Sequence, residues 1–254
     1  MFNFLKFKIF HKPLTLHKAH DFCASKKPKM TVVFVHGIAA DATSFSKALK
    51  YLEGTNSMKD VRFVAFDLLG SGKSYHSDDL NYDFNDQIKA LENSIKKLKA
   101  KTPLVMVGHS MGTLIATRYA AAHKKAIKRL ILVSPPVYRE EDVKNPMFKT
   151  ALDTFRKIVA KKSKKILTQK AFVNEMELIV SNPKNYKFLA TITTPTVLIY
   201  GDMDQIIASF NIPGIVKKNP KYISTIKTIG GHSVSRDKYV KILDELEEVL
   251  HEII

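Results

Sequence analysis

A serine set between two glycines is the first feature of this sequence that could carry out chemistry. Gly108-His109-Ser110-Met111-Gly112 directly follows an apolar run, Leu104–Val107, and opens a helical pattern, Met111–His123. On such a strand-to-helix turn the hydroxyl lies outside the sheet, and the glycines let strand and helix pack closely. The helix N-terminus also offers free N–H groups to developing negative charge. The pattern predicts Ser110 as a nucleophile; the alternative is a serine that only caps the helix.

A serine hydroxyl is a weak nucleophile at neutral pH, so it needs a base that a carboxylate orients. The loop after the last strand-like run contains two glycines and His232, and no other histidine follows a late strand. We therefore expect His232 to be the base. The loop before it holds two candidate acids, Asp202 and Asp204. Asp202 directly follows a glycine and is typical of a turn brace, so Asp204 is the preferred acid.

A second loop is expected to supply an oxyanion hole. His36-Gly37-Ile38 ends the apolar run Thr31–Val35, and the predicted donors are the backbone amides of Ile38 and Met111. The alternative is a simple tight turn that uses the glycine. Gly37 and His109, which lie beside the expected oxyanion hole and nucleophile, are further expected to contact substrate.

The elements that must position these residues alternate along the chain, which predicts an α/β fold with crossover connections. Most strand-like runs are continuously apolar or β-branched, as in a parallel sheet buried on both faces. The predicted strands are Thr31–Val35, Val61–Phe66, Leu104–Val107, Arg129–Val133, Thr196–Tyr200 and Tyr222–Thr228. The predicted helices between and after them are Ser44–Glu53, Asn85–Ala100, Met111–His123 and Asp237–Glu252.

One stretch interrupts this alternation. Residues 137–192 contain no convincing strand but show helical patterns around Phe148–Ala160 and Gln169–Val180. Proline-containing turns border the stretch on both sides. We predict a core formed by residues 1–136 and 193–254, and a helical cap, or lid, formed by 137–192. Several apolar cap residues could line an acyl pocket or form the packing face of the cap itself: Phe148, Leu152, Phe155, Ile158, Met176, Leu178 and Ile179.

Five segments together resemble the successive motifs of the α/β-hydrolase superfamily. They are Val35-His36-Gly37-Ile38, Asp67-Leu68-Leu69-Gly70-Ser71-Gly72-Lys73-Ser74, Gly108-His109-Ser110-Met111-Gly112, Gly201-Asp202-Met203-Asp204 and Gly231-His232. The resemblance implies the α/β-hydrolase fold, a mostly parallel sheet of about eight strands flanked by helices, with a helical cap inserted after strand six. It also implies that Asp204 is the acid and that no cofactor is used. Phe45 stands where the family often has a tryptophan, and we count it among the expected substrate contacts.

The expected function is that of a serine hydrolase that cleaves a carboxylic ester or related acyl bond of a small substrate through an acyl-enzyme. A thioesterase, a carbon–carbon bond hydrolase and a perhydrolase would use the same triad. Relatives that open epoxides or remove halide have an aspartate in place of Ser110, which disfavours those reactions. A non-catalytic ligand-binding protein on the same fold is the alternative from another class.

The composition limits the binding partners, the metal and disulfide chemistry, and the cellular location that can be expected. The chain has 254 residues and a net charge of +17, but its lysines are spread along the whole chain, which favours solvation over nucleic-acid binding. The only cysteine, Cys23, excludes an internal disulfide, and no histidine spacing predicts a metal site. No signal peptide is recognisable, so a cytoplasmic location is expected. Apolar residues alternate with lysines in residues 1–12, which indicates a first strand, a packed helix or a weak peripheral membrane contact.

The basic segment Arg156–Lys165 lies within the predicted cap and has six basic residues in ten. We interpret it as an exposed helix face, and attraction of an anionic substrate or membrane surface is the alternative.

Overall fold

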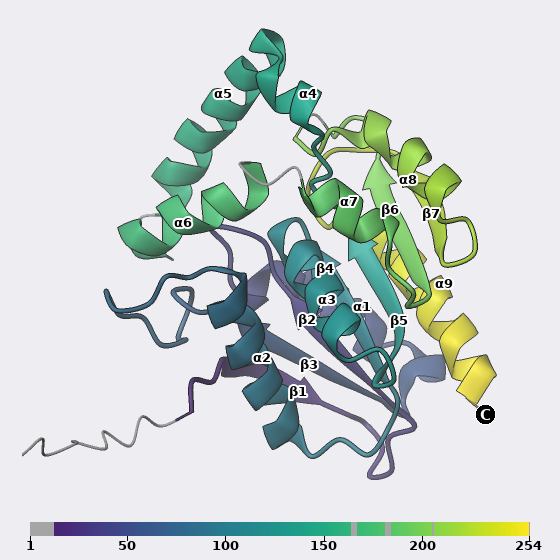
Figure 1. The fold of residues 1–254 in the computed structure, drawn as a ribbon. Coiled ribbons are helices and arrows are strands. Elements are labelled where there is room, and N and C mark those ends of the chain that lie inside the picture. The colour runs from purple at the N-terminus through teal and green to yellow at the C-terminus, as the bar shows by residue number, and fades with distance from the viewer. Residues whose placement is uncertain (1–12, 164–166, 181–183, 205, 254) are drawn as a thin grey trace, which may run out of the picture.

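A seven-stranded sheet forms the centre of the molecule. The structure, a computed structural model, describes residues 13–163, 167–180, 184–204 and 206–253 (Figure 1). The strand order is β1-β3-β2-β4-β5-β6-β7; β1 runs antiparallel to β3, and every other pairing is parallel. The strands are β1 (His17–Phe22), β2 (Met30–Val35), β3 (Val61–Asp67), β4 (Leu104–His109), β5 (Ile127–Val133), β6 (Thr196–Gly201) and β7 (Ile223–Thr228).

The six strands that the sequence predicts are all confirmed, with ends that shift by one or two residues. The family resemblance implies about eight strands, whereas the described residues form seven. Only one antiparallel strand, β1, precedes the parallel set there, so the helical insertion follows the fifth strand instead of the sixth. β1 was not predicted because its sequence is mostly polar; it pairs along one side only and four of its six residues are exposed.

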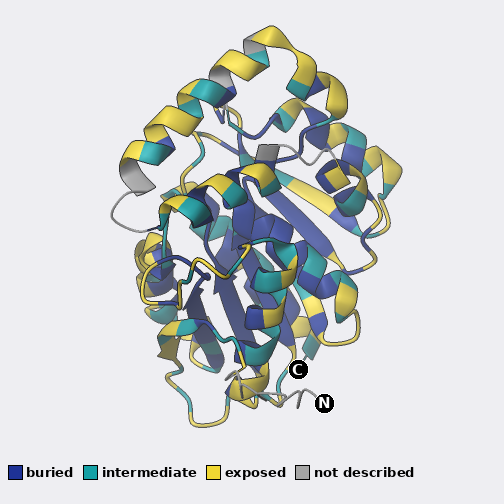
Figure 2. Cartoon of the chain, turned by 60° about the vertical axis from the view of Figure 1, so that its left-hand side comes forward, coloured by how far each residue is buried: buried dark blue, intermediate teal, exposed yellow. Residues whose placement is uncertain are grey.

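Helices cover both faces of the sheet. One face packs against α1 and α9, and the other against α2, α3 and α8. Strands β2 and β4 are continuously buried up to their last residues, as expected for parallel strands between two helical layers (Figure 2). The bounds of these helices are α1 (Ser46–Glu53), α2 (Phe84–Leu98), α3 (Met111–Ala122), α8 (Ile212–Lys218) and α9 (Arg236–Ile253).

The insertion rises above the carboxyl edge of the parallel strands (Figure 1). Its described residues form α4 (Glu140–Lys144), α5 (Pro146–Ser163), α6 (Gln169–Val180) and α7 (Lys184–Ala190), which lie within the predicted 137–192 segment. Several contacts connect the region of α6 to the core, two of them through buried residues. Leu167 forms an isolated antiparallel bridge with Ser71, and the buried Glu175 accepts a hydrogen bond from Gln87 Nε2 at 3.2 Å.

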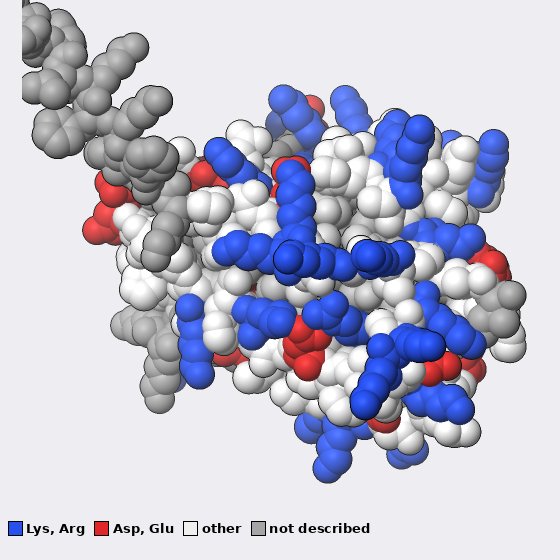
Figure 3. Space-filling view, turned by 90° about the horizontal axis from the view of Figure 1, so that it is seen from below, with Lys and Arg blue, Asp and Glu red and all other residues white. Residues whose placement is uncertain are grey.

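The opposite, amino edge of the sheet carries many exposed lysines. They lie in or beside the loops that precede β2, β3, β4, β5 and β7, and Figure 3 shows the molecule from this side. The exposed lysines are Lys26, Lys27, Lys29, Lys59, Lys99, Lys101, Lys124, Lys125, Lys128, Lys217, Lys218 and Lys221. The charge that the sequence spreads along the chain therefore gathers in part at the end of the molecule away from the insertion.

None of the described helices combines the length and the hydropathy that crossing a bilayer requires. Residues 1–12, on which the expectation of membrane contact rests, lie outside the described residues.

Candidate active site

Ser110 lies at the junction of β4 and α3 in a strained backbone conformation. Its φ of 51° and ψ of −122° lie in a region that non-glycine residues rarely adopt. Three hydrogen bonds hold this turn: the Ser110 N–H donates to Val133 O at 2.9 Å, and Ser110 O accepts from the Thr113 N–H at 2.9 Å and from the Thr113 hydroxyl at 2.6 Å. A surrounding sheet and helix therefore enforce a turn that presents the side chain beyond the end of β4, as the sequence pattern predicts.

The glycines on either side of Ser110 are required by close backbone packing. A Cβ on Gly112 would lie 2.1 Å from Val35 O, and a Cβ on Gly108 would lie 2.8 Å from Gly112 O. Both distances are far below van der Waals contact, and both involve backbone that cannot move aside easily. α3 therefore approaches the ends of β2 and β4 as closely as it does only because these positions lack side chains.

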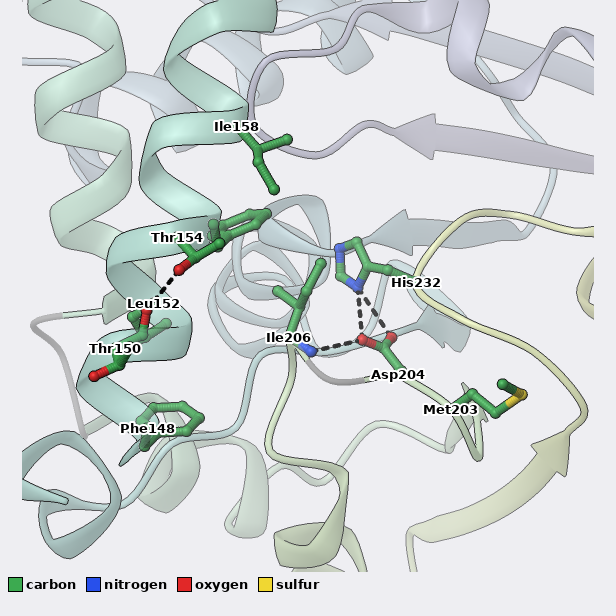
Figure 4. A pocket seen from close by; sticks show the side chains of 10 residues that line it. Phe148, Thr150, Leu152, Thr154, Ile158, Met203, Asp204, Ile206 and His232 are labelled. Atoms are coloured by element: carbon green, nitrogen blue, oxygen red, sulfur yellow. Dashed lines mark hydrogen bonds and ion pairs between the residues drawn. The ribbon is translucent and has the colours of Figure 1, made fainter. Parts of the chain in front are cut away.

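His232 and Asp204 form a hydrogen-bonded pair, although they come from loops after different strands. His232 Nδ1 lies 2.9 Å from Asp204 Oδ2 and 3.2 Å from Asp204 Oδ1 (Figure 4). The Asp204 side chain is fully buried, whereas that of His232 is 18% exposed. Burial by itself would raise the pKa of the Asp204 carboxyl, but the hydrogen bonds from His232, the Ile206 N–H and Ser134 outweigh it, and the pKa is lowered. Asp204 is thus held as a carboxylate beside the imidazole.

Asp202, the other candidate acid, lies away from this pair. Its carboxylate accepts a hydrogen bond from the Gly230 N–H at 3.1 Å, and the residue is exposed. It joins the loop after β6 to the loop after β7, which agrees with the turn-bracing part expected of it.

Ser110 and His232 line one cavity of about 410 Å³, together with Gly37 and Ile38 of the loop after β2. Met111, the other expected oxyanion donor, is the first residue of α3. His36 fixes the loop that carries Ile38: its Nδ1 donates to Gly37 O at 2.8 Å, and its Nε2 accepts from the Leu68 N–H at 2.8 Å. Burial lowers the pKa of His36, which keeps the ring neutral and this pair of bonds intact.

The comparisons with known proteins agree with this geometry. A family profile described as the alpha/beta hydrolase fold matches residues 31–174, more than half of the chain. The chain belongs to the α/β-hydrolase family. Its curated relatives include Lipase 1 of Psychrobacter immobilis, 24% identical over 84% of this chain and 73% of the lipase. A protein named "Probable lysophospholipase BODYGUARD 2", from Arabidopsis thaliana, is 35% identical over 45% of this chain and 24% of the plant protein. The chain therefore aligns with only about a quarter of that relative.

Solved structures give the same fold. An esterase from Exiguobacterium antarcticum superposes with a TM-score of 0.70, at 20% identity, over 91% of this chain and 94% of the esterase. A monoacylglycerol lipase from Paleococcus ferrophilus superposes with a TM-score of 0.65, at 20% identity, over 95% of this chain and all of the lipase. At these identities the likeness establishes the fold, and the relatives place this α/β-hydrolase in an esterase- and lipase-like branch.

A second cavity, of about 550 Å³, also borders His232 of this α/β-hydrolase and is bounded by α5 of the insertion (Figure 4). Four of the seven apolar residues considered for an acyl pocket line it: Phe148, Leu152, Phe155 and Ile158. Met176 and Ile179 are instead buried in the core cluster beneath the insertion. Leu178 is half-buried and lines neither cavity. Phe155 and His232 border both cavities, so the two spaces meet at the imidazole.

His109 lines the first cavity, as expected of a substrate contact, but it also holds the loop of the base. Its Nε2 lies 2.9 Å from His232 O and must donate, because a carbonyl oxygen only accepts. Burial, and then the neighbouring His232, lower the pKa of His109 to about 3, so the ring stays neutral. The residue before the predicted nucleophile, Ser110, is thereby tied to His232, the residue expected to act as its base.

Phe45 does not make the substrate contact expected of it. Its side chain is fully buried, its ring packs 5.1 Å from that of Phe34, and it lines neither of the two cavities. The physical reason is its place on the face of the sheet covered by α1 and α9, where it fills the core below β2.

Sequence reasoning missed Lys238. Its side chain is fully buried, and Nζ donates to Ser134 Oγ at 2.9 Å and to the carbonyl oxygens of Gly231 and Ser233. One signal could have found it: Lys238 lies four residues before Ile242, on the apolar stripe that α9 turns toward the sheet. A lysine on such a stripe needs buried oxygen acceptors.

Proposed function

We propose that this α/β-hydrolase cleaves carboxylic esters with an apolar acyl group, using Ser110 as nucleophile, His232 as base and Asp204 as acid. One observation carries the proposal: the strained Ser110 turn borders the same cavity as His232, and His232 is hydrogen-bonded to Asp204. Two of its relatives are named a lipase and a probable lysophospholipase. Both names denote enzymes that hydrolyse ester bonds, which supports ester hydrolysis as the reaction class.

In the first half of the proposed reaction, Asp204 holds the N–H of His232 Nδ1. The other ring nitrogen, Nε2, takes the proton from Ser110 Oγ as that oxygen bonds to the ester carbonyl carbon. The negative charge moves to the former carbonyl oxygen. This oxygen would accept hydrogen bonds from the backbone amides of Ile38 and Met111. When this tetrahedral adduct collapses, the bond to the alcohol oxygen breaks, and the alcohol leaves with the proton from His232.

The second half repeats these steps with water. His232 Nε2 takes a proton from water as its oxygen bonds to the acyl carbon, and the bond to Ser110 Oγ breaks. The serine recovers the proton from His232, and a carboxylic acid is released. Asp204 stays ionised throughout, because its hydrogen bonds lower the pKa of its carboxyl.

The larger cavity supports an apolar acyl group. Its volume of about 550 Å³ lies within the roughly 300–1,000 Å³ typical of small-molecule sites. Phe148, Leu152, Phe155 and Ile158 supply an apolar wall, and His232 is at its inner end. The smaller cavity borders Thr43, Ser44 and Lys47 and would take the more polar alcohol side of the ester.

A fluorophosphonate probe and a panel of p-nitrophenyl esters, from acetate to palmitate, test this proposal. We expect the wild type to be labelled on Ser110 and to hydrolyse the panel with a preference for acyl chains that the larger cavity can hold. Ser110→Ala should keep the fold, lose the label, and lose turnover by about 10⁴-fold or more. A Ser110→Ala variant with undiminished turnover would overturn the proposal.

Adding other substrate classes to the panel separates the other activities that this triad could support. If a matched thioester, a β-diketone, or peroxide with a carboxylic acid were turned over faster than the ester, that substrate class would replace the ester in the proposal. Ligand binding without labelling and without turnover would instead indicate a non-catalytic protein on this fold.

A further inference from the structure

Three consecutive carbonyl groups, those of Gly231, His232 and Ser233, accept hydrogen bonds from side chains outside the loop. Lys238 Nζ donates to Gly231 O and, at 3.1 Å, to Ser233 O. His109 Nε2 donates to His232 O at 2.9 Å. The loop after β7 contains two glycines and gains little rigidity from its own sequence. Its backbone is therefore oriented by donors from β4 and from the start of α9.

The ammonium group of Lys238 has one acceptor for each of its three protons. The third acceptor is Ser134 Oγ, at 2.9 Å, and the whole side chain is inaccessible to solvent. Burying a charged group is costly unless hydrogen bonds and a nearby opposite charge compensate. An apolar side chain on this stripe of α9 would fill the same space without that cost. We therefore look for the role of the ammonium group in the three oxygen atoms that it orients, and not in filling space.

The contacts of Lys238 extend to both residues of the His232–Asp204 pair. Gly231 and Ser233 are the chain neighbours of His232, so their carbonyls set the direction from which the imidazole enters the site. Ser134, whose hydroxyl oxygen accepts from Lys238, is also one of the polar side chains that lower the pKa of the Asp204 carboxyl. Lys238 itself lines neither cavity and cannot contact a substrate there.

We propose that Lys238 is a positioning residue for the reaction: with His109 it holds the loop of His232 so that the imidazole stays on Asp204 and faces Ser110. The inference rests on the proposed function, because it assigns Lys238 to the base of that triad. Misplacing a reacting group by about 1 Å can cost about 100-fold in rate. A residue that acts only in this way changes kcat and leaves KM unchanged, since substrate binding does not involve it.

Lys238→Met, which keeps the length of the side chain and removes the ammonium, tests the proposal. The matched control is Lys241→Met, one turn along the same helix, where the lysine side chain is 43% exposed and paired with Asp244. We expect kcat to fall about 30-fold in Lys238→Met with KM within twofold, and neither to change in Lys241→Met. An unchanged kcat, or a kcat loss that is restored at a lower temperature because the variant had merely begun to unfold, would overturn it.

A signal from the triad itself gives a readout that general destabilisation does not move. The proton between His232 Nδ1 and Asp204 should give a far-downfield proton NMR resonance in the wild type. We expect it to broaden or shift in Lys238→Met and to stay in place in Lys241→Met; a resonance unchanged in both variants counts against the proposal. If Lys238→Met does not fold, Ser134→Ala removes one of the three acceptors, and a smaller fall in kcat at constant KM is expected.

The NMR measurement also separates two failures. If the wild type hydrolyses nothing in the panel, the proposed function fails, but the resonance still reports whether Lys238 positions His232. If the wild type is active and Ser110→Ala is not, while Lys238→Met keeps both the rate and the resonance, only the positioning role is wrong.

Discussion

The two edges of the sheet use charged side chains in opposite ways. At the carboxyl edge, Asp204 and Lys238 are buried, and each has hydrogen-bond partners. At the amino edge, lysines such as Lys124 and Lys125 are exposed on loops between the elements. A buried charge is fixed in place and perturbs its neighbours strongly, whereas an exposed charge is solvated and screened. The same residue type can therefore be decisive at one end of the molecule and replaceable at the other.

The largest difference between a buried and an exposed charge is expected within one loop, between Asp204 and Asp202. Asp204→Asn keeps the shape of the side chain but removes the charge that orients His232, so we expect kcat to fall by about 10⁴-fold. Asp202→Asn, two residues away, changes an exposed carboxylate that accepts a hydrogen bond from the Gly230 N–H. Its kcat should stay within about twofold of the wild type. Steady-state kinetics on one p-nitrophenyl ester compares the two, and a larger loss in Asp202→Asn would reverse the assignment.

Much of the contrast could be predicted from the sequence, because both edges follow from the alternation of strands and helices. Runs such as Leu104–Val107 are apolar on both faces, and residues that follow them must collect at one edge of a parallel sheet. Ser110 and Asp204 each follow such a run and His232 follows the last predicted strand, so their neighbourhood was predictable. β1 was not, because a mostly polar segment pairs along one side of the sheet and carries no apolar pattern.

The contacts that hold these residues could not be predicted. That His109 reaches His232 O depends on how the end of β4 meets a loop residue 123 positions away in the chain. A lysine in a charged helix is ordinarily exposed, and only the docked position of α9 reveals the oxygens around Lys238. Phe45 was misplaced for a related reason: a position near a motif does not say which face of the sheet a side chain joins.

The difference between buried and exposed charged groups can also be tested by measuring stability, at a buried carboxyl group of the insertion. Glu175 of α6 is fully buried, and burial raises its pKa well above the usual value. The folded protein keeps this proton at pH values where the unfolded chain has lost it. The folded state thus binds more protons, and stability falls as pH rises above about 4.3, the usual glutamate value, by up to about 1.4 kcal/mol per pH unit.

Glu175→Gln removes this titratable group. Near pH 4 its free energy of unfolding should gain nothing from the change, and its advantage over the wild type should grow as the pH rises toward neutral. The matched control, Glu177→Gln, changes an exposed glutamate on the same helix. Its stability should follow the wild type at every pH. Urea unfolding at a series of pH values measures both, and a constant difference between Glu175→Gln and the wild type would contradict the expectation.

The smallest effect is expected at the amino edge. Lys124→Glu and Lys125→Glu together reverse two exposed charges in the loop before β5, at the end of the molecule away from the two cavities. Beyond a Debye length of about 8 Å at physiological salt, exposed charges are largely screened, and exposed substitutions usually change stability by less than about 0.5 kcal/mol. We expect kcat and KM for a neutral ester to stay within about twofold and retention on a cation exchanger to fall. Two charges reversed here should thus change kcat less than the loss of one buried ammonium at Lys238. A kcat loss in the double variant as large as that in Lys238→Met would mean that charge, and not burial and bonding, makes the carboxyl edge sensitive.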